Sequence, residues 1–405
     1  MNRIIFNRSY SKLLFLSLAV TFAVMQSACK KEVDGGAPVI TGVRNYEAPP
    51  ADTLVKAIST GQWVVLLGHN LKDAVQISFN GVPVTFNSAM FSDTSAAVQV
   101  PSVIPFPSVP AENLNTIRYV TSRGATTFTF SIVAPPPDIT GISNENAKAG
   151  DSVYIYGGNF FFIEKIIFAG LPVTAYIASG DGTSIGFVLP KLAQSGPVVI
   201  TTQSGTTATK YNVNDTITGV LCDFDNINTF NWGTNIDNSS ASFPGSRGNY
   251  AVLVNDVLPA GDATWWNPQR SINTNDVQWV PSDSLNVPID QYAFKFEINV
   301  PDAWNGTSIY IAKGYSFDYI ARYEPWLNAN GAVSSFTTKG WRTVTIPLSM
   351  FRKDDGKGAA AASLAVLLGT SGAGAVNIHT RNFSSSPTAS GLHAAIDNIR
   401  VVKIK

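Results

Sequence analysis

The sequence is poor in charged residues, in histidine and in cysteine. Only 14% of the 405 residues are charged, and the 28 basic residues balance the 28 acidic ones. A net charge of zero gives no bulk attraction to nucleic acid, so we expect no nucleic-acid partner. Low charge together with 32 glycines and 23 prolines is more typical of extracellular β-rich modules than of cytosolic helical enzymes. The length predicts two or three domains.

Catalytic signatures are also missing. The sequence has no His-Glu-x-x-His, no Cys-x-x-Cys and no phosphate-binding loop. Its three histidines, His69, His379 and His393, are scattered, and each is better explained as a surface or core residue. A glycosidase needs two carboxylates about 5–10 Å apart, and the sequence does not pair any. We therefore predict that the protein is not an enzyme, with glycoside hydrolysis as the less favoured alternative.

The N-terminal apolar run, Leu13–Val24, has 12 residues. A membrane-spanning helix needs about 20, whereas a signal-peptide core has this size. The run ends at Gln-Ser-Ala-Cys29, which resembles a bacterial lipobox whose cysteine is lipidated. We predict a lipoprotein signal peptide over 1–28, a lipid anchor on Cys29 and a flexible tether over 29–37, with ordinary secretion as the alternative.

The second cysteine, Cys222, is then left without a partner. A bridge to Cys29 would join a tether to a domain core. We therefore expect no internal disulfide, and we interpret Cys222 as a small buried residue on a strand.

An internal repeat follows the tether. Gly61–Leu71 (GQWVVLLGHNL) aligns with Gly150–Phe160 (GDSVYIYGGNF), an offset of 89 residues, and the same offset carries Phe79–Thr85 onto Phe168–Thr174. One offset over separated blocks indicates a duplication. Short alternating runs between Gly, Asn and Pro turns, over about 80–100 residues, predict an immunoglobulin-like sandwich for each copy. The strand pattern predicts that Trp63 is buried.

Both copies resemble the IPT/TIG family, whose motif is a Gly-x-x-Val-x-Ile-x-Gly-x-Asn-Phe run followed by an F-x-G-x-x-V strand. We assign IPT/TIG domains to 38–134 and 135–216, with Pro135–Pro137 as a stiff joint. Stiff joints and stacked sandwiches favour a spacer. The alternative is that the repeats bind a ligand themselves.

The chain changes character after residue 217, since seven of the eight tryptophans lie beyond it. Alternating strands at 292–300, 308–311 and 341–346 predict a larger β-sandwich of the jelly-roll type over 217–405. The fold class is therefore all-β. The run Leu364–Leu368 is compatible with a strand or a short helix.

Aromatic residues concentrate in Trp304–Trp326, where they fill seven of 23 positions, 30% against 11% for the chain. Polar side chains lie between the rings. Sugar rings pack their C–H groups on aromatic faces, and their hydroxyls need donors and acceptors. Trp265-Trp266 is a second candidate, because the turn formers around it favour an exposed loop.

The C-terminal domain resembles surface glycan-binding protein B of outer-membrane polysaccharide uptake systems. The resemblance rests on Leu221–Asn226 (LCDFDN), Arg322–Trp326 (RYEPW) and Gly340–Leu348 (GWRTVTIPL). It implies a non-catalytic lipoprotein on the outer-membrane surface, with a polysaccharide ligand such as xyloglucan or another β-glucan, beside a glycan-uptake transporter complex. A structural adhesin or assembly subunit that binds protein is the rival interpretation.

We predict that a glycan stacks on aromatic side chains and that three polar side chains form hydrogen bonds with its hydroxyls. No cofactor is predicted, although Asp225 and Asp397 could approach each other and hold a structural Ca²⁺, or equally serve turns and salt bridges. The stacking candidates are Trp326, Tyr323, Trp265, Trp266 and Trp304, and the polar candidates are Arg322, Glu324 and Asp318.

Overall fold

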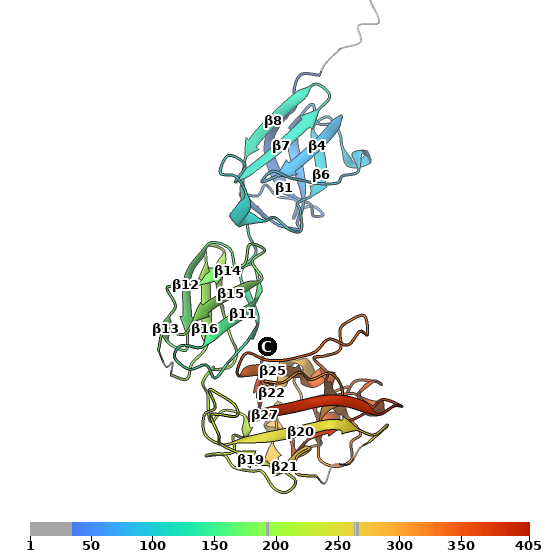
Figure 1. Ribbon diagram of the computed structural model, residues 1–405. Helices are drawn as coiled ribbons and strands as arrows, with labels where there is room; N and C mark the ends of the chain where they lie inside the picture. Colours follow the sequence, from blue (N-terminus) through green and yellow to red (C-terminus); the bar gives the residue numbers. More distant parts are fainter. Residues whose placement is uncertain (1–34, 192–193, 263, 265–266) are drawn as a thin grey trace, which may run out of the picture. The chain divides into compact units, whose positions relative to one another are not determined.

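The computed structural model describes residues 35–191, 194–262, 264 and 267–405 (Figure 1). These residues form β-strands joined by loops and a few short helices, which confirms the all-β prediction. The chain divides into two compact units: the described residues up to Ile104 with Val109–Val133, and Pro105–Ser108 with Ala134–Lys405. Among the described residues, no helix is long and apolar enough to cross a membrane.

The first unit is a sandwich of two main sheets. One has the order β1-β3-β6 and the other β5-β4-β7-β8, while β2 pairs in parallel with β9. Inward side chains such as Val64, Leu66 and Phe79 are fully buried between the sheets. The strands are β1 (Val39–Asn45), β2 (Ala57–Ser59), β3 (Trp63–His69), β4 (Ala74–Phe79), β5 (Val82–Pro83), β6 (Ser95–Gln99), β7 (Thr116–Thr121), β8 (Gly124–Thr129) and β9 (Ser131–Val133).

The predicted burial of Trp63 is wrong. Trp63 begins β3 and is 43% exposed, and its ring lies 5.8 Å from that of Tyr46. Successive residues of a strand point to opposite faces, so the burial of its neighbour Val64 turns Trp63 outward.

The second sandwich repeats the main strand order of the first and adds β14 at one sheet edge. Its sheets run β10-β11-β15-β14 and β13-β12-β16-β17. Both copies begin with the same bulge, between Ile40 and Gly42 in the first and between Ile139 and Gly141 in the second. The strands are β10 (Asp138–Ile142), β11 (Ser152–Gly158), β12 (Ile163–Phe168), β13 (Leu171–Pro172), β14 (Ile177–Ala178), β15 (Ser184–Val188), β16 (Val198–Thr202) and β17 (Gly205–Ala208).

The structure explains the repeated Gly-x-Asn motif. A Cβ on Gly68 would lie 1.8 Å from the carbonyl oxygen of Val39, and Gly157 has the same close neighbour in its own copy, so neither position accepts a side chain. Two residues later, Asn70 and Asn159 adopt left-handed backbone angles, φ 60° and 59°. Asparagine tolerates this conformation, and each amide donates a 3.1 Å hydrogen bond to the carbonyl of a residue that precedes β1 or β10.

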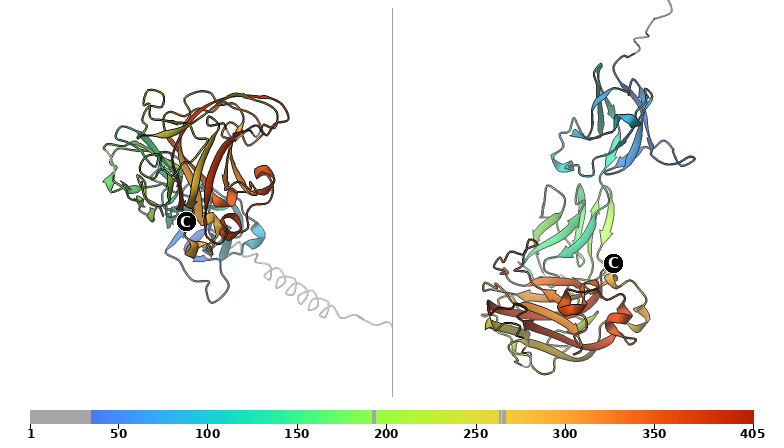
Figure 2. Two further views of the ribbon diagram at one scale, coloured as in Figure 1. Left: turned by 90° about the horizontal axis from the view of Figure 1, so that it is seen from below. Right: turned by 90° about the vertical axis from the view of Figure 1, so that its right-hand side faces the viewer.

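The third region packs two sheets face to face, as the yellow-to-red part of the chain shows in Figures 1 and 2. The larger sheet has the order β19-β20-β27-β22-β25, with β18 paired to β27, and the smaller has the order β21-β26-β23-β24. The strands are β18 (Val220–Cys222), β19 (Ile236–Asp237), β20 (Tyr250–Leu258), β21 (Ser271–Gln278), β22 (Tyr292–Asn299), β23 (Ser308–Lys313), β24 (Ile320–Tyr323), β25 (Arg342–Pro347), β26 (Ala373–Arg381) and β27 (Thr388–Lys403).

One apolar core lies between these two sheets. It includes Cys222, which is fully buried on β18 as predicted. The run Leu364–Leu368, for which the sequence allowed a strand or a short helix, forms the helix α3, which is capped by Ser363. The other helical segments are α2 (Lys353–Gly356) and the 3₁₀ turns η1 (Ser88–Met90), η2 (Phe106–Ser108), η3 (Ser282–Ser284), η4 (Ile289–Gln291) and η5 (Leu348–Met350).

A buried ion cluster joins the second sandwich to the third region. Glu145, in the loop after β10, lies 2.6 Å from the Nζ of Lys295 and 2.8 Å from the Nη2 of Arg400. Arg400 also contacts Glu297 at 2.8 Å, and the Nζ of Lys295 lies 3.4 Å from the ring centroid of Tyr211. The four charged side chains are at most 5% exposed. The second sandwich and the third region therefore share an interior.

Burial and ion pairing shift the pKa values of Lys295 and Glu145 in opposite directions. Burial lowers the pKa of Lys295 to about 8, although Glu145 opposes that change. Burial alone would raise the pKa of Glu145, but the charges of Lys295 and Arg400 outweigh it and lower that pKa. The cluster is therefore held by mutual pairing, and each ion depends on its partners.

Candidate glycan-binding surface

The outer face of the smaller sheet, which points away from the core between the sheets, carries buried polar side chains on β21 and β26 and an apolar cluster on β23 and β24. Alternate residues of β26, Val376 and Ile378, belong to the core, while Asn377 and His379 point the other way. In antiparallel strands, directly opposed residues share a face. The outer face therefore includes the residues opposite Asn377 and His379, which are Ser271, Asn273, Tyr310 and Ala312.

Two loops are fixed on this outer face by its polar side chains. Asn273 Nδ2 donates to the carbonyl of Trp232 at 3.0 Å, and Ser271 Oγ donates to that of Gly233 at 2.6 Å. His379 Nε2 lies 3.0 Å from the carbonyl of Thr264. Burial, reinforced by the charge of Arg270, lowers the pKa of His379 to about 3, so its ring is neutral and acts as a hydrogen-bonding group. This agrees with a structural histidine.

Two loops, one after β18 and one after β23, together present an exposed aromatic pair. Trp232 is 39% exposed and Tyr315, which follows β23, is 43% exposed. Their ring centroids lie 6.3 Å apart with planes inclined by 19°, so the two rings form a stacked pair. Because the Asn273 and Ser271 bonds fix the carbonyls of Trp232 and Gly233, the backbone that carries the Trp232 ring is positioned by the sheet beneath it.

Three predicted polar and aromatic residues line one cleft at the edge strand β24. The cleft measures about 340 Å³ and is lined by Arg322, Glu324 and Trp326, together with Phe383. Arg322 lies 3.5 Å from Glu324, and its guanidinium lies 3.4 Å from the centroid of the Phe383 ring. Trp326 is half-buried, and its Nε1 donates to the carbonyl of Thr307 at 2.8 Å.

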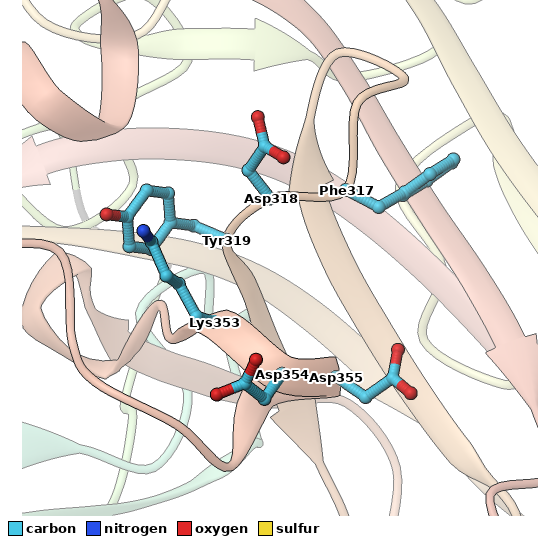
Figure 3. A pocket seen from close by; sticks show the side chains of 6 residues that line it. All are labelled: Phe317, Asp318, Tyr319, Lys353, Asp354 and Asp355. Carbon is cyan, nitrogen blue, oxygen red and sulfur yellow. The ribbon is translucent and has the colours of Figure 1, made fainter.

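Asp318 lies in a neighbouring cavity of about 640 Å³ (Figure 3). The carboxylates of Asp318, Asp354 and Asp355 point in different directions there. Asp355 is paired with Arg381 at 2.8 Å, and its carbonyl accepts a hydrogen bond from Arg322, so a residue of this cavity is bonded to a residue of the cleft. Within the described residues, no three His, Cys, Asp or Glu side chains are placed to hold a metal ion.

Residues 213–403 match the model of a family described as the surface glycan-binding protein B xyloglucan binding domain. The C-terminal domain belongs to this family. An IPT/TIG domain-containing protein of Bacteroides ovatus is 22% identical, over 84% of this chain and 89% of its own length. The surface glycan-binding protein PbSGBP-B from Prevotella bryantii has a similar fold, with a TM-score of 0.69 at 24% identity, over 92% of this chain and all of that chain.

In this surface glycan-binding protein B domain, the predicted stacking role of Trp304 is wrong. Trp304 is fully buried, and its ring packs 5.9 Å from that of Tyr323 and 6.1 Å from that of Phe336. Tyr323 lies mostly against the same core, and burial raises its pKa to about 12. Trp265 and Trp266 lie outside the described residues.

Sequence reasoning missed Trp232 in the surface glycan-binding protein B domain. Among the described tryptophans after residue 217, Trp232 alone is exposed, while Trp279 and Trp304 are buried and the others are half-buried. The signal was available, because Trp232 stands between Asn231 and Gly233, both turn formers. The same argument had selected Trp265-Trp266.

The two acidic candidates for a structural ion serve the local backbone. Asp225 accepts hydrogen bonds from the amide and the side chain of Asn249, and Asp397 accepts one from the amide of Asn398. Burial raises the pKa of Asp397 well above its ordinary value, and the charges of Glu297 and Asp225 add to that rise. These contacts correspond to the turn alternative.

Proposed function

We propose that the protein is a non-catalytic, lipid-anchored cell-surface protein that captures an uncharged polysaccharide, xyloglucan or another β-glucan, for an outer-membrane uptake system. The family of residues 213–403 supports the ligand class. The observation that carries the proposal is the exposed, stacked pair of Trp232 and Tyr315 on the outer face of the smaller sheet.

The dimensions of the surface favour a chain-like ligand. Tyr315 follows one end of β23, and the Arg322–Glu324–Trp326 cleft lies at the other. Six residues of strand span about 20 Å. A single stacking contact contributes on the order of 1 kcal/mol, so useful affinity requires several contacts along one chain. We infer that the glycan runs along the β23–β24 edge of the sheet.

The charges favour a neutral ligand and binding without hydrolysis. In the cleft, the carboxylate of Glu324 is paired with Arg322, and in the neighbouring cavity that of Asp355 is paired with Arg381. Hydrolysis needs one carboxyl group to donate a proton while another stays ionised and open to the sugar. Paired carboxylates are better suited to bonding sugar hydroxyls.

The central test is Trp232→Ala, with affinity measured by calorimetry on xyloglucan and on a mixed-linkage β-glucan. We expect at least a tenfold loss of affinity with little change in melting temperature, because the ring is exposed. Trp63→Ala is the matched control, since Trp63 is equally exposed in the other compact unit. Equal affinities for the wild type and Trp232→Ala would contradict the proposal.

Trp326→Ala tests the cleft. We expect weaker binding and also a lower melting temperature, because the indole donates to Thr307 and packs against the core. Unchanged affinity in a folded variant would remove the cleft from the binding surface. A blank glycan array for the wild type, together with capture of a protein, would favour the adhesin alternative.

The anchor is proposed from the sequence, since residues 1–34 lie outside the described part. Growth with labelled palmitate should label the wild type and leave Cys29→Ala unlabelled. An unlabelled wild type would remove the lipid anchor from the proposal. Co-purification with an outer-membrane transporter would test the proposed uptake complex.

A further inference from the structure

The second sandwich exposes an aromatic pair of its own. Tyr154 and Tyr156 on β11 are 49% and 40% exposed, and their rings lie 6.4 Å apart with planes inclined by only 12°. The residues between and beside them, Val153 and Ile155, are fully buried, so strand alternation directs both tyrosines to the outer face. The pair therefore presents two nearly parallel rings, each with a phenolic hydroxyl.

The equivalent positions of the first sandwich carry different residues. With the offset of 89 residues, Val65 and Leu67 of the first copy align with Tyr154 and Tyr156 of the second. Val65 is only 4% exposed and Leu67 is half-buried. The tyrosine pair is therefore a property of the second copy, and the shared fold does not require it.

The residues directly opposite the pair on β15 are small and uncharged. Gly186 and Ser184 on β15 lie directly opposite Tyr154 and Tyr156, and Ile177 on β14 lies opposite Gly186. The Tyr154 ring covers Gly186, where an added Cβ would lie 2.8 Å from a ring carbon. Glycine at 186 thus allows the ring to lie against the sheet. The residues directly opposite the two rings on β15 thus carry no charge.

The pair also adjoins the interface with the C-terminal domain. The amide of Tyr154 donates to Ser143 Oγ at 2.8 Å, and the carbonyl of Ser143 accepts a 2.8 Å bond from the amide of Thr343 on β25. The next residues of this loop lead to Glu145 in the buried ion cluster. The tyrosine pair is therefore part of the same compact unit as the C-terminal domain.

We propose that Tyr154 and Tyr156 form a second glycan-binding site, which takes an uncharged β-glucan chain across the two rings. This inference rests on the proposed function for the class of ligand. Two weak sites on one body strengthen retention on a polymer, because the second contact becomes intramolecular once the first has formed. The second IPT/TIG domain then contributes binding as well as spacing.

The experiment is affinity electrophoresis of the full-length protein in gels containing xyloglucan or mixed-linkage β-glucan. We expect the double variant Tyr154→Ser, Tyr156→Ser to weaken retention several-fold. Adding Trp232→Ala to this double variant should abolish the retention that the single variant Trp232→Ala still shows. Replacing both tyrosines by Phe should preserve most retention, because the rings remain. Tyr176→Ser, an exposed tyrosine of the same sandwich outside the pair, should behave as the wild type.

Melting temperatures provide the folding control, and we expect them to change little because both rings are exposed. Retention of the double serine variant equal to that of the wild type would overturn the second site while leaving the proposed function intact. A wild type that no glucan gel retains would overturn both. Loss of retention in the Phe variant would contradict stacking as the mode of binding.

Discussion

The two sandwiches of the duplication share the order of their main strands and differ in the loop after their first strand. When Gly42 is aligned with Gly141, Tyr46 of the first copy corresponds to Glu145 of the second. Tyr46 is 50% exposed and lies beside Trp63, whereas Glu145 is 1% exposed between Lys295 and Arg400. The first copy is a compact unit by itself, and the second belongs to the same unit as the C-terminal domain.

This difference shows how a duplicated module can become part of its neighbour without changing its fold. Glu145 pairs with two buried cations of the larger sheet, Lys295 and Arg400, and Arg400 is also paired with Glu297. An uncompensated buried charge costs several kcal/mol, so the unit that contains the second sandwich and the C-terminal domain depends on Glu145 for its stability. The first sandwich carries no corresponding carboxylate at that position, since Tyr46 stands there.

The largest expected effect comes from Glu145→Ala. Removing the carboxylate leaves Lys295 and Arg400 buried with one fewer partner, and we expect the free energy of unfolding of the second unit to fall by about 3–5 kcal/mol. Tyr46→Ala, at the equivalent position, should cost less than about 1 kcal/mol. Calorimetric unfolding measures both. Similar losses for the two variants would remove the distinction between the copies.

Acidification should diminish the advantage of Glu145. Its pKa is lowered in the folded protein, so its contribution is present above the ordinary value of about 4.5 and is lost as the pH falls below it. The difference in unfolding free energy between the wild type and Glu145→Gln should therefore narrow below about pH 4.5. The raised pKa of Asp397 acts on both proteins and cancels in the difference. A difference that widens in acid would contradict this assignment.

Thr343→Val tests the hydroxyl that links the second sandwich to the C-terminal domain beside the ion cluster. Thr343 Oγ1 accepts a 2.8 Å bond from the amide of Glu145 and donates to Glu297 at 2.9 Å. Losing both should cost about 1–3 kcal/mol in unfolding free energy. Thr345→Val, two residues along the same strand and exposed, is the matched control and should change stability by less than about 0.5 kcal/mol. Equal free energies of unfolding for the two valine variants would show that the contact between the second sandwich and the C-terminal domain does not depend on this hydroxyl.

Trp63→Ala in the first sandwich should have a smaller effect than Thr343→Val. The variant loses only the tilted contact with Tyr46 at 5.8 Å and some exposed surface, so we expect about 0.5–1.5 kcal/mol. Denaturant titration measures the loss. A cost of several kcal/mol would show that the ring supports the first sandwich in a way that its exposure does not indicate.

The repeat and the sandwich folds could be predicted because they rest on local signals. Gly68 and Gly157 recur where no side chain fits, and the left-handed Asn70 and Asn159 follow at the same spacing. The tryptophan-rich composition also pointed to the correct domain. The assignment of individual rings was less successful, since Trp304 proved buried and Trp232 was missed.

The sequence by itself determined the duplication, the all-β class and the family of the C-terminal domain, because strand period and turn residues are properties of neighbouring positions. Only the tertiary structure decided which aromatic residues are exposed, because the face that a strand buries depends on register and on the sheet that packs against it. It alone also paired Glu145 with Lys295 and Arg400, 150 and 255 residues away. No local pattern encodes partners at that separation, so the buried ion cluster became visible only in the folded chain.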